Sequence, residues 1–128
     1  MYPGIKVYNI KSFIRKNESG VLTRERIFEI IREIGVLATC LPEKDILLDF
    51  RETKLNEDID MTDAMKFVIE ANYFKEVLTN KIACLLPADH ARLEKAEKVR
   101  VLMQIKGIKY RYFTNFEHAI EWLSSSRV

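Results

Sequence analysis

The chain has 128 residues, of which 48% are apolar and 31% charged, an ordinary composition for a globular domain. Its 21 basic residues are nearly balanced by 19 acidic ones, so the net charge of +2 does not indicate a nucleic-acid or membrane surface. The basic residues also alternate with acids, as in "ARLEKAEKVR" (91–100), which is typical of solvated helix faces.

No segment approaches the ~18 apolar residues of a membrane span, and the N-terminus lacks a signal-peptide pattern. Cys84 lies in an apolar run and is expected to be buried. Cys40 lies near an expected helix end and is predicted to be more accessible. Two unrelated cysteines without a targeting signal favour a cytoplasmic protein without a disulfide.

The N-terminal region is expected to form two short strands. Residues 5–9 and 11–17 are β-rich runs separated by polar residues, which predicts an N-terminal β-hairpin or two successive strands. The residues Asn-Glu-Ser-Gly at 17–20 have turn composition. Thr23 is then expected to cap a helix that weakens at Gly35. Its apolar side chains recur with helical spacing: Ile27, Ile30, Ile31 and Ile34.

Two apolar runs of strand length, residues 45–50 and 81–87, are expected to be strands covered on both faces. A helix is predicted between them, after an acidic stretch at 57–63. The residues expected on its inner side are Ala64, Met65, Val68, Ile69 and Asn72. A third helix is expected to begin at Asp89 and to stop at Gly107.

Residues 108–113 alternate in the manner of a half-exposed or edge strand. Thr114 and Glu117 form a T-x-x-E capping box before the last helix. The resulting order, β-β-α-β-α-β-α-β-α, predicts a single α/β domain over residues 1–128. Its four- or five-stranded sheet is expected to be mixed, because the N-terminal hairpin would add an antiparallel portion to a parallel sheet.

Four segments carry a resemblance to a known family: "SGVLTRERIFEII" (19–31), "ILLDFRET" (46–53), "KIACLLP" (81–87) and "YRYFTNFEHAIEWL" (110–123). The last resembles the closing motif of the SpoIIAA-like proteins, which belong to the STAS group of sulfate transporter and anti-sigma factor antagonist domains. The resemblance implies a small α/β domain with a mixed sheet and about four helices, often found as a homodimer. The same general fold is shared with CRAL-TRIO lipid-transfer domains.

We therefore expect a non-enzymatic binding or regulatory module that forms a homodimer and acts through protein–protein contacts. The CRAL-TRIO parallel provides an alternative, a carrier of a small apolar or lipid-like ligand. A third hypothesis is a phospho-regulated anti-sigma factor antagonist. In that family an Asp-Ser-Ser-Gly helix start takes the phosphate, and the segment 60–63, Asp-Met-Thr-Asp, is the nearest match. Thr62 would be the phosphorylated residue, although Asp60 and Asp63 would repel the phosphate.

The acidic stretch allows three further interpretations. Asp60 and Asp63 have the spacing of a helix cap, and this is the favoured one. Residues 58–62 match the Asp-x-Asp-x-Thr signature of haloacid dehalogenase-type phosphatases, but the preceding strand is expected to end near Phe50, seven residues too early. Asp58, Asp60 and Asp63 could supply oxygen ligands to a metal ion. An EF-hand loop needs a glycine where Asp63 stands, however, so no metal is expected.

Catalytic patterns are otherwise absent from the sequence. His90 and His118 stand alone on different expected helices and have no recognisable relation to a cysteine or serine nucleophile. No glycine-rich nucleotide-binding motif occurs, so neither an enzyme nor a cofactor is predicted. Aromatic residues are instead the candidates for an interface or ligand site. They are Tyr73, Phe74, Tyr110, Tyr112 and Trp122. Tyr73 and Phe74 occupy adjacent helix positions and cannot both face one core.

Overall fold

The computed structural model describes residues 13–125. The strands are β1 (Phe13–Leu22), β2 (Asp45–Leu55), β3 (Ile82–Leu85) and β4 (Tyr110–Phe113). The helices are α1 (Arg24–Cys40), α2 (Met61–Asn72), α3 (His90–Ile105) and α4 (Phe116–Leu123). Helices and strands alternate along this part of the chain, as the sequence predicts.

The four strands form one sheet in the order β1-β2-β3-β4, and all neighbouring pairs are parallel. The predicted mixed sheet is therefore wrong. The predicted hairpin is also wrong for β1, which pairs in parallel with β2 and is not half of a hairpin. Residues 5–9, the other half of that prediction, lie outside the described residues. A helix follows each of the first three strands and returns the chain to the same end of the sheet, which makes the next strand parallel.

The expected turn at 17–20 is an irregularity inside a strand. The pairing register shifts between Asn17 and Ser19, where β2 advances from Asp49 to Glu52. Gly20 has a φ of +86°, a conformation that residues with a Cβ rarely adopt. β1 thus continues to Leu22, and β2 continues beyond Phe50 to residue 55. The sequence prediction ended β2 too early because the polar run 51–54 does not look like a buried strand.

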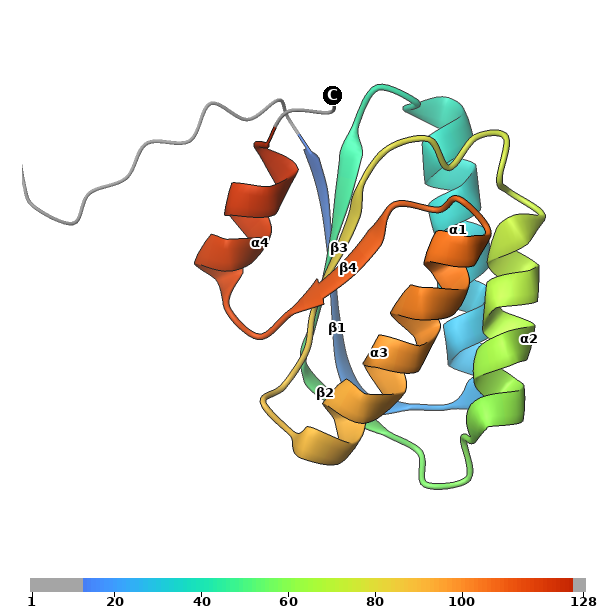
Figure 1. The fold of residues 1–128 in the computed structure, drawn as a ribbon, viewed down its shortest axis with the longest axis vertical. Coiled ribbons are helices and arrows are strands. Elements are labelled where there is room, and N and C mark those ends of the chain that lie inside the picture. Colours follow the sequence, from blue (N-terminus) through green and yellow to red (C-terminus); the bar gives the residue numbers. More distant parts are fainter. Residues whose placement is uncertain (1–12, 126–128) are drawn as a thin grey trace, which may run out of the picture.

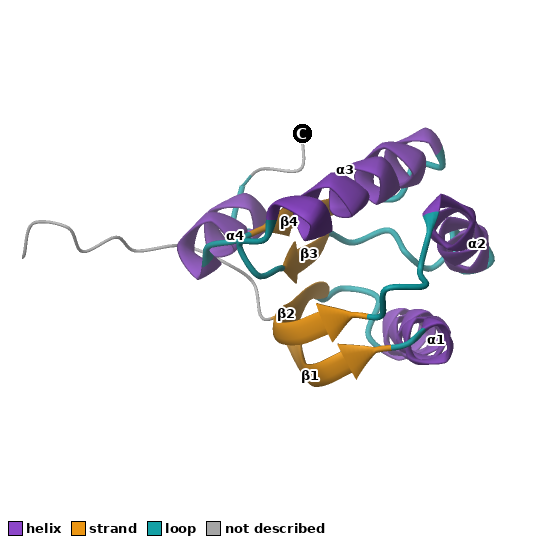
Figure 2. Ribbon diagram, turned by 90° about the horizontal axis from the view of Figure 1, so that it is seen from below, coloured by secondary structure: helices purple, strands orange, loops and turns teal. Residues whose placement is uncertain are grey.

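The helices form two unequal layers. Figure 1 shows α1, α2 and α3 on one face of the sheet and α4 alone on the other. The view from below in Figure 2 shows the curved sheet between them. Right-handed crossovers between strands in sequential order place every crossover helix on the same face, which accounts for the three-helix layer.

Each face of the sheet has its own apolar core. Alternation along β2 sends Ile46 and Leu48 toward α1–α3, whereas Leu47 packs against α4. On the α4 side the cluster is small, and consists of Leu47, Ala83, Leu85, Ala119, Ile120 and Leu123. Strands β2 and β3 are covered on both faces, as their near-continuous apolar sequences predict.

Helix caps account for most of the helix boundaries. Thr23, Asp60 and Asp89 each accept a hydrogen bond from a backbone N–H in the first helical turn, as predicted. Gly107 follows α3 with a φ of +78°, which suits a helix stop. The capping box predicted at Thr114 is wrong by one residue. Asn115 is the cap of α4, and its side chain accepts from the backbone N–H of His118.

Two details of the helices differ from the sequence prediction. Gly35 does not weaken an end but lies buried within α1, which continues to Cys40. The buried face of α2 is not the predicted one. Met65 and Ile69, which were expected to face the core, are 50% and 53% exposed. The residues buried on α2 are Asp63, Ala64, Phe67, Val68 and Ala71. None of the helices within residues 13–125 combines the length and apolar character needed to cross a bilayer.

Candidate functional site

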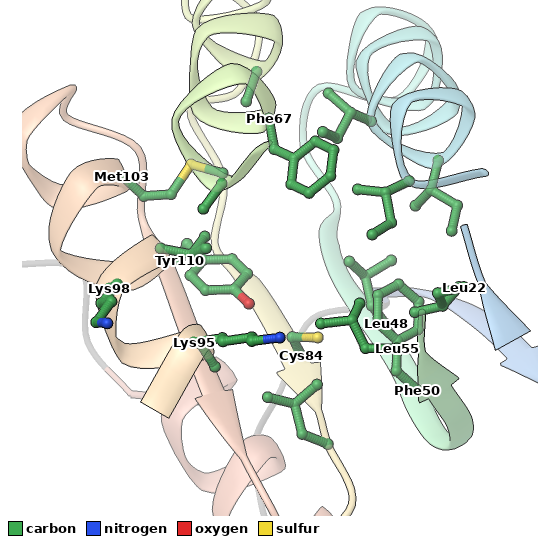
Figure 3. Close-up of a pocket in the computed structure, with 18 of the residues that line it drawn as sticks. Leu22, Leu48, Phe50, Leu55, Phe67, Cys84, Lys95, Lys98, Met103 and Tyr110 are labelled. Carbon is green, nitrogen blue, oxygen red and sulfur yellow. The ribbon is translucent and has the colours of Figure 1, made fainter. Parts of the chain in front are cut away.

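A cavity of about 240 Å³ lies between the sheet and helices α1–α3. Figure 3 shows its interior, with side chains converging from the sheet below and the helices above. Its lining is predominantly apolar, and includes Leu22, Leu48, Phe50, Leu55, Phe67 and Met103. The most enclosed walls are buried residues of β2 and β3, whereas the partly exposed Met61 marks where the cavity reaches the surface.

Two features of the chain leave this volume unfilled. Alanines at three helix positions that face the cavity, Ala64, Ala71 and Ala96, provide little side-chain volume. The second feature is the long β1–β2 pair, which extends past the short β3 and β4. Phe50 and Leu55 are five positions apart and would face opposite sides of a regular strand, but the register shift in β2 lets both line the cavity. The cavity therefore runs along the helix-covered face of the sheet, from Ile82 at the amino end of β3 to Leu22 and Leu55 at the carboxyl ends of β1 and β2.

Three cationic side chains of α3 line the cavity, namely Arg92, Lys95 and Lys98. Arg92 is 8% exposed, and its guanidinium donates to the Thr53 carbonyl oxygen at 3.3 Å and to Thr53 Oγ1 at 3.0 Å. Burial lowers the pKa of Arg92 from its ordinary value. Lys95 and Lys98 are exposed, and Lys95 Nζ donates to the carbonyl oxygen of Ile59 at 3.1 Å.

Cys84 and Tyr110 contribute the polar atoms of the inner wall. Burial raises the pKa of the Cys84 thiol to about 12, so the thiol stays protonated at neutral pH and is a poor nucleophile. Burial also raises the pKa of the Tyr110 hydroxyl well above its usual value. As predicted, Cys84 is buried and Cys40 is exposed.

The acidic stretch forms the start of α2 and one side of the cavity mouth. Asp60 and Asp63 make the predicted reciprocal capping box. Asp63 also accepts two hydrogen bonds from Arg24, at 2.6 and 3.0 Å, and the pKa of its carboxyl is held well below the usual range by that guanidinium. Asp58 is exposed, with its carboxylate 3.7 Å from Arg24. Thr62 is exposed in the first turn of α2.

The strand before this stretch differs from the one assumed in the phosphatase comparison. β2 ends at Leu55, so two residues, Asn56 and Glu57, rather than seven separate the strand from Asp58. Asp58 remains exposed, and it does not line the cavity. Among residues 13–125, no group of three or more His, Cys, Asp and Glu side chains is placed to hold a metal ion.

The structure does not bring the five aromatic candidates together. Tyr110 lines the cavity, and Tyr112 packs on the same side of the sheet with its hydroxyl 3.0 Å from a Glu97 oxygen. Trp122 lies on the opposite face, beside Phe113 at 5.9 Å between ring centroids. The adjacent helix-end pair is split as expected, since Tyr73 is 78% exposed and Phe74 packs against the core.

A second surface feature is a row of apolar side chains on the outer face of α2. Met61, Met65 and Ile69 are spaced by four residues and are 42%, 50% and 53% exposed. Tyr73 continues the row just beyond the helix. We call these four residues the α2 stripe. Side chains with this spacing share one face of a helix, so the stripe is a continuous apolar surface.

Sequence reasoning missed the cavity and its cations. The cavity is formed by residues from all three crossover helices and all four strands, and no local pattern identifies such a set. The alternating charges of residues 91–100 predict a solvated helix face, whereas Arg92, Lys95 and Lys98 line the cavity. Their spacing of three residues, next to the small Ala96, was the available signal, because it places them along one side of α3.

The chain was compared with models of known protein families, with curated proteins and with solved structures. None of these comparisons found a match.

Proposed function

We propose that the protein is a non-enzymatic binding module that holds a small apolar ligand in the cavity between its sheet and helices α1–α3. The observation that carries this proposal is an apolar cavity of about 240 Å³ that reaches the surface. Protein interiors are normally close-packed, so a chain that leaves this volume empty loses dispersion contacts along the whole lining. A bound apolar molecule would restore those contacts.

The volume sets the size of the ligand. An apolar cavity of ~150 Å³ accommodates one benzene ring, so a volume of about 240 Å³ holds ~10 non-hydrogen atoms by proportion. This is below the ~300–1,000 Å³ typical of sites for drug-sized molecules. The cavity thus suits a single short alkyl chain or a small ring system.

Octan-1-ol is a suitable probe of this proposal because its size matches the cavity. We expect it to raise the melting temperature of the protein with increasing concentration, since a ligand that binds only the folded state stabilises that state. Replacing the buried Ala96 with leucine should fill part of the cavity and weaken this stabilisation. Ala91→Leu, on the exposed side of the same helix, is the matched control and should bind as the wild type does.

Two results would contradict the ligand proposal. One is an absence of stabilisation in both the wild type and Ala91→Leu. The other is equal stabilisation of wild type and Ala96→Leu, because binding would then occur elsewhere. Native mass spectrometry of freshly purified protein complements the titration, since a retained ligand would add to the mass of 15.0 kDa.

The α2 stripe favours a second function, protein contact through a homodimer. A two-fold axis across α2 would pair the stripe with itself in an antiparallel arrangement. Lys66 and Glu70 occur on this helix as opposite charges four residues apart. The same axis would bring Lys66 near Glu70 of the second copy, where it would join the contact that Glu70 makes with Arg32 at 3.4 Å. Burying Met65 and Ile69 would remove apolar surface from water, which drives association.

Sedimentation of the full chain tests the dimer. We expect twice the monomer mass for the wild type and the monomer mass for Ile69→Lys. Val21→Lys is the control, because Val21 is 60% exposed on β1 and lies outside the stripe. A wild type that stays monomeric at high protein concentration would exclude this contact.

A further inference from the structure

We propose that the ligand is a linear amphiphile with an anionic head group, held at the cavity mouth by Lys95 with Lys98 and Arg92 beside it. This inference rests on the proposed apolar ligand and adds the chemistry of its polar end. The apolar lining takes the alkyl tail, and the cations of α3 take the head group.

The charges around the cavity favour an anion. Three of its lining residues are cations, and one, Asp60, is an anion, so the lining has a net charge of +2 (three minus one). Asp60 is already engaged as the cap of α2, where its carboxylate accepts from the backbone N–H of Asp63 at 3.1 Å. Asp89 lies nearby at the start of α3, but it accepts from the backbone N–H of Arg92 and does not line the cavity.

The cations of the mouth have no carboxylate partner in the part of the chain that the structure describes. No salt bridge within 4.0 Å joins an Asp or Glu of residues 13–125 to Arg92, Lys95 or Lys98. The guanidinium of Arg92 is buried with only neutral acceptors, both from Thr53. A buried charge without a counter-ion is costly, and an anionic ligand would supply the missing opposite charge.

Lys95 is the residue placed to make the direct contact. Its ammonium has three N–H donors, and one donates to the carbonyl oxygen of Ile59 across the mouth. Figure 3 shows the Lys95 side chain extending from α3 into the cavity. Its two other donors make no bond to residues 13–125 and would meet the oxygens of a head group. A hydrogen bond between opposite charges is stronger than one between neutral groups.

The experiment measures affinity for three probes that share the same octyl chain. Octanoate and octyl phosphate carry anionic heads, and octan-1-ol carries a neutral one. We expect octanoate to bind the wild type about tenfold more tightly than octan-1-ol. This affinity ratio lies between the ratios that an exposed ion pair and a buried hydrogen bond to a charged group would produce. Comparing octyl phosphate with octanoate then identifies which anion the site prefers.

Lys95→Gln should reduce the ratio between octanoate and octan-1-ol affinities to about one or two, because octanoate loses its charged partner and octan-1-ol does not. Lys75→Gln is the matched control, because Lys75 is exposed and lies outside the cavity. This variant should retain the wild-type ratio. High salt should lower the ratio for the wild type, because salt screens exposed charges.

The outcomes separate the two proposals. If octan-1-ol binds in the cavity and neither anion binds more tightly, the anionic head group is refuted and the apolar site stands. The same holds if Lys95→Gln leaves the ratio at the wild-type value, since Lys95 then does not bind the head. If none of the three probes stabilises the protein, the proposed function itself fails.

Discussion

The carboxylate of Asp63 connects the starts of two neighbouring helices. It accepts from Arg24 Nε at 2.6 Å and Nη2 at 3.0 Å, and from the backbone N–H of Asp60 at 3.0 Å. Arg24 is the first residue of α1, and Asp63 lies in the first turn of α2. One acidic side chain therefore completes a capping box and also fixes the spacing of two helix ends beside the cavity.

This carboxylate should make stability depend on acid pH. Interaction with Arg24 holds the pKa of Asp63 well below the usual range, and Arg51 and Arg100 lower the pKa values of Asp49 and Glu97 to about 2. A depressed pKa contributes stability above the unfolded value of ~4, and this stability is lost as the pH falls through the folded value. We expect the free energy of unfolding in urea to be level near neutral pH and to decline between about pH 4 and pH 2.

Asp63→Asn should lower stability at pH 7 and flatten the decline below pH 4, because one of the titrating carboxylates is gone. Asp58→Asn is the control. Asp58 has a side chain that is 60% exposed and contacts Arg24 only at 3.7 Å, so its replacement should have little effect. Identical acid profiles for the wild type and Asp63→Asn would show that the Arg24 contact does not contribute.

The ring of Phe74 packs against Gly35 and leaves no room for a side chain there. A Cβ at position 35 would lie 2.3 Å from a ring carbon, which is too close for van der Waals contact. We expect Gly35→Ala to destabilise the protein by about 1–3 kcal/mol through overpacking, although alanine normally favours a helix over glycine by ~1 kcal/mol. Urea unfolding measures the change. In the double variant with Phe74→Leu the cost of Gly35→Ala should shrink, and a purely additive result would contradict the ring contact.

Lys81 directly precedes β3 and bonds to the C-terminal end of α4. Its ammonium donates to the carbonyl oxygens of Trp122 and Ser125 at 2.8 and 3.0 Å, and it lies 5.3 Å from the centroid of the Trp122 ring. Lys81→Met keeps the length of the side chain but removes these bonds, and should cost about 1–3 kcal/mol. Hydrogen exchange should become faster in α4 and stay unchanged in α1. Uniformly faster exchange would point to a general loss of stability.

Tyr112 links the edge strand β4 to α3 through its hydroxyl. Removing the 3.0 Å hydrogen bond to Glu97 by Tyr112→Phe should cost about 1 kcal/mol, measured by urea unfolding. Tyr73→Phe makes the same chemical change at a side chain that is 78% exposed, and should be neutral. Equal effects of the two substitutions would contradict a structural role for the Tyr112 bond.

The alternation of elements was predictable because each has a local signal. The apolar runs of β2 and β3, the helical spacing of Ile27, Ile30 and Ile34, and the caps at Thr23, Asp60 and Asp89 all depend on nearby residues. The acidic stretch was recognised as a cap for the same reason. Asp60 and Asp63 are three residues apart, which is the spacing that allows each side chain to accept a hydrogen bond from the backbone N–H of the other.

Longer-range features were not predictable from such signals. Strand direction depends on what connects and pairs the strands, so the parallel pairing of β1 with β2 could not be derived from the polar residues 17–20. The inner face of α2 was misplaced because Met65 and Ile69 satisfy the helical spacing as well as Phe67 does. The cavity escaped prediction because an empty volume is a property of several facing elements, here including Ala64, Ala71 and Ala96.

The sequential strand order has a consequence for how the molecule is completed during synthesis. Every pair of neighbours in the sheet is also consecutive along the chain, so each new β-α unit can add to the edge left by the previous one. The early units, β1 to α2, supply the β2 wall and Phe67, whereas Lys95 and Tyr110 arrive last. A nascent chain that has emerged only through α2 would hold an open apolar trough, and retention of a ligand would have to wait until α3 and β4 close it.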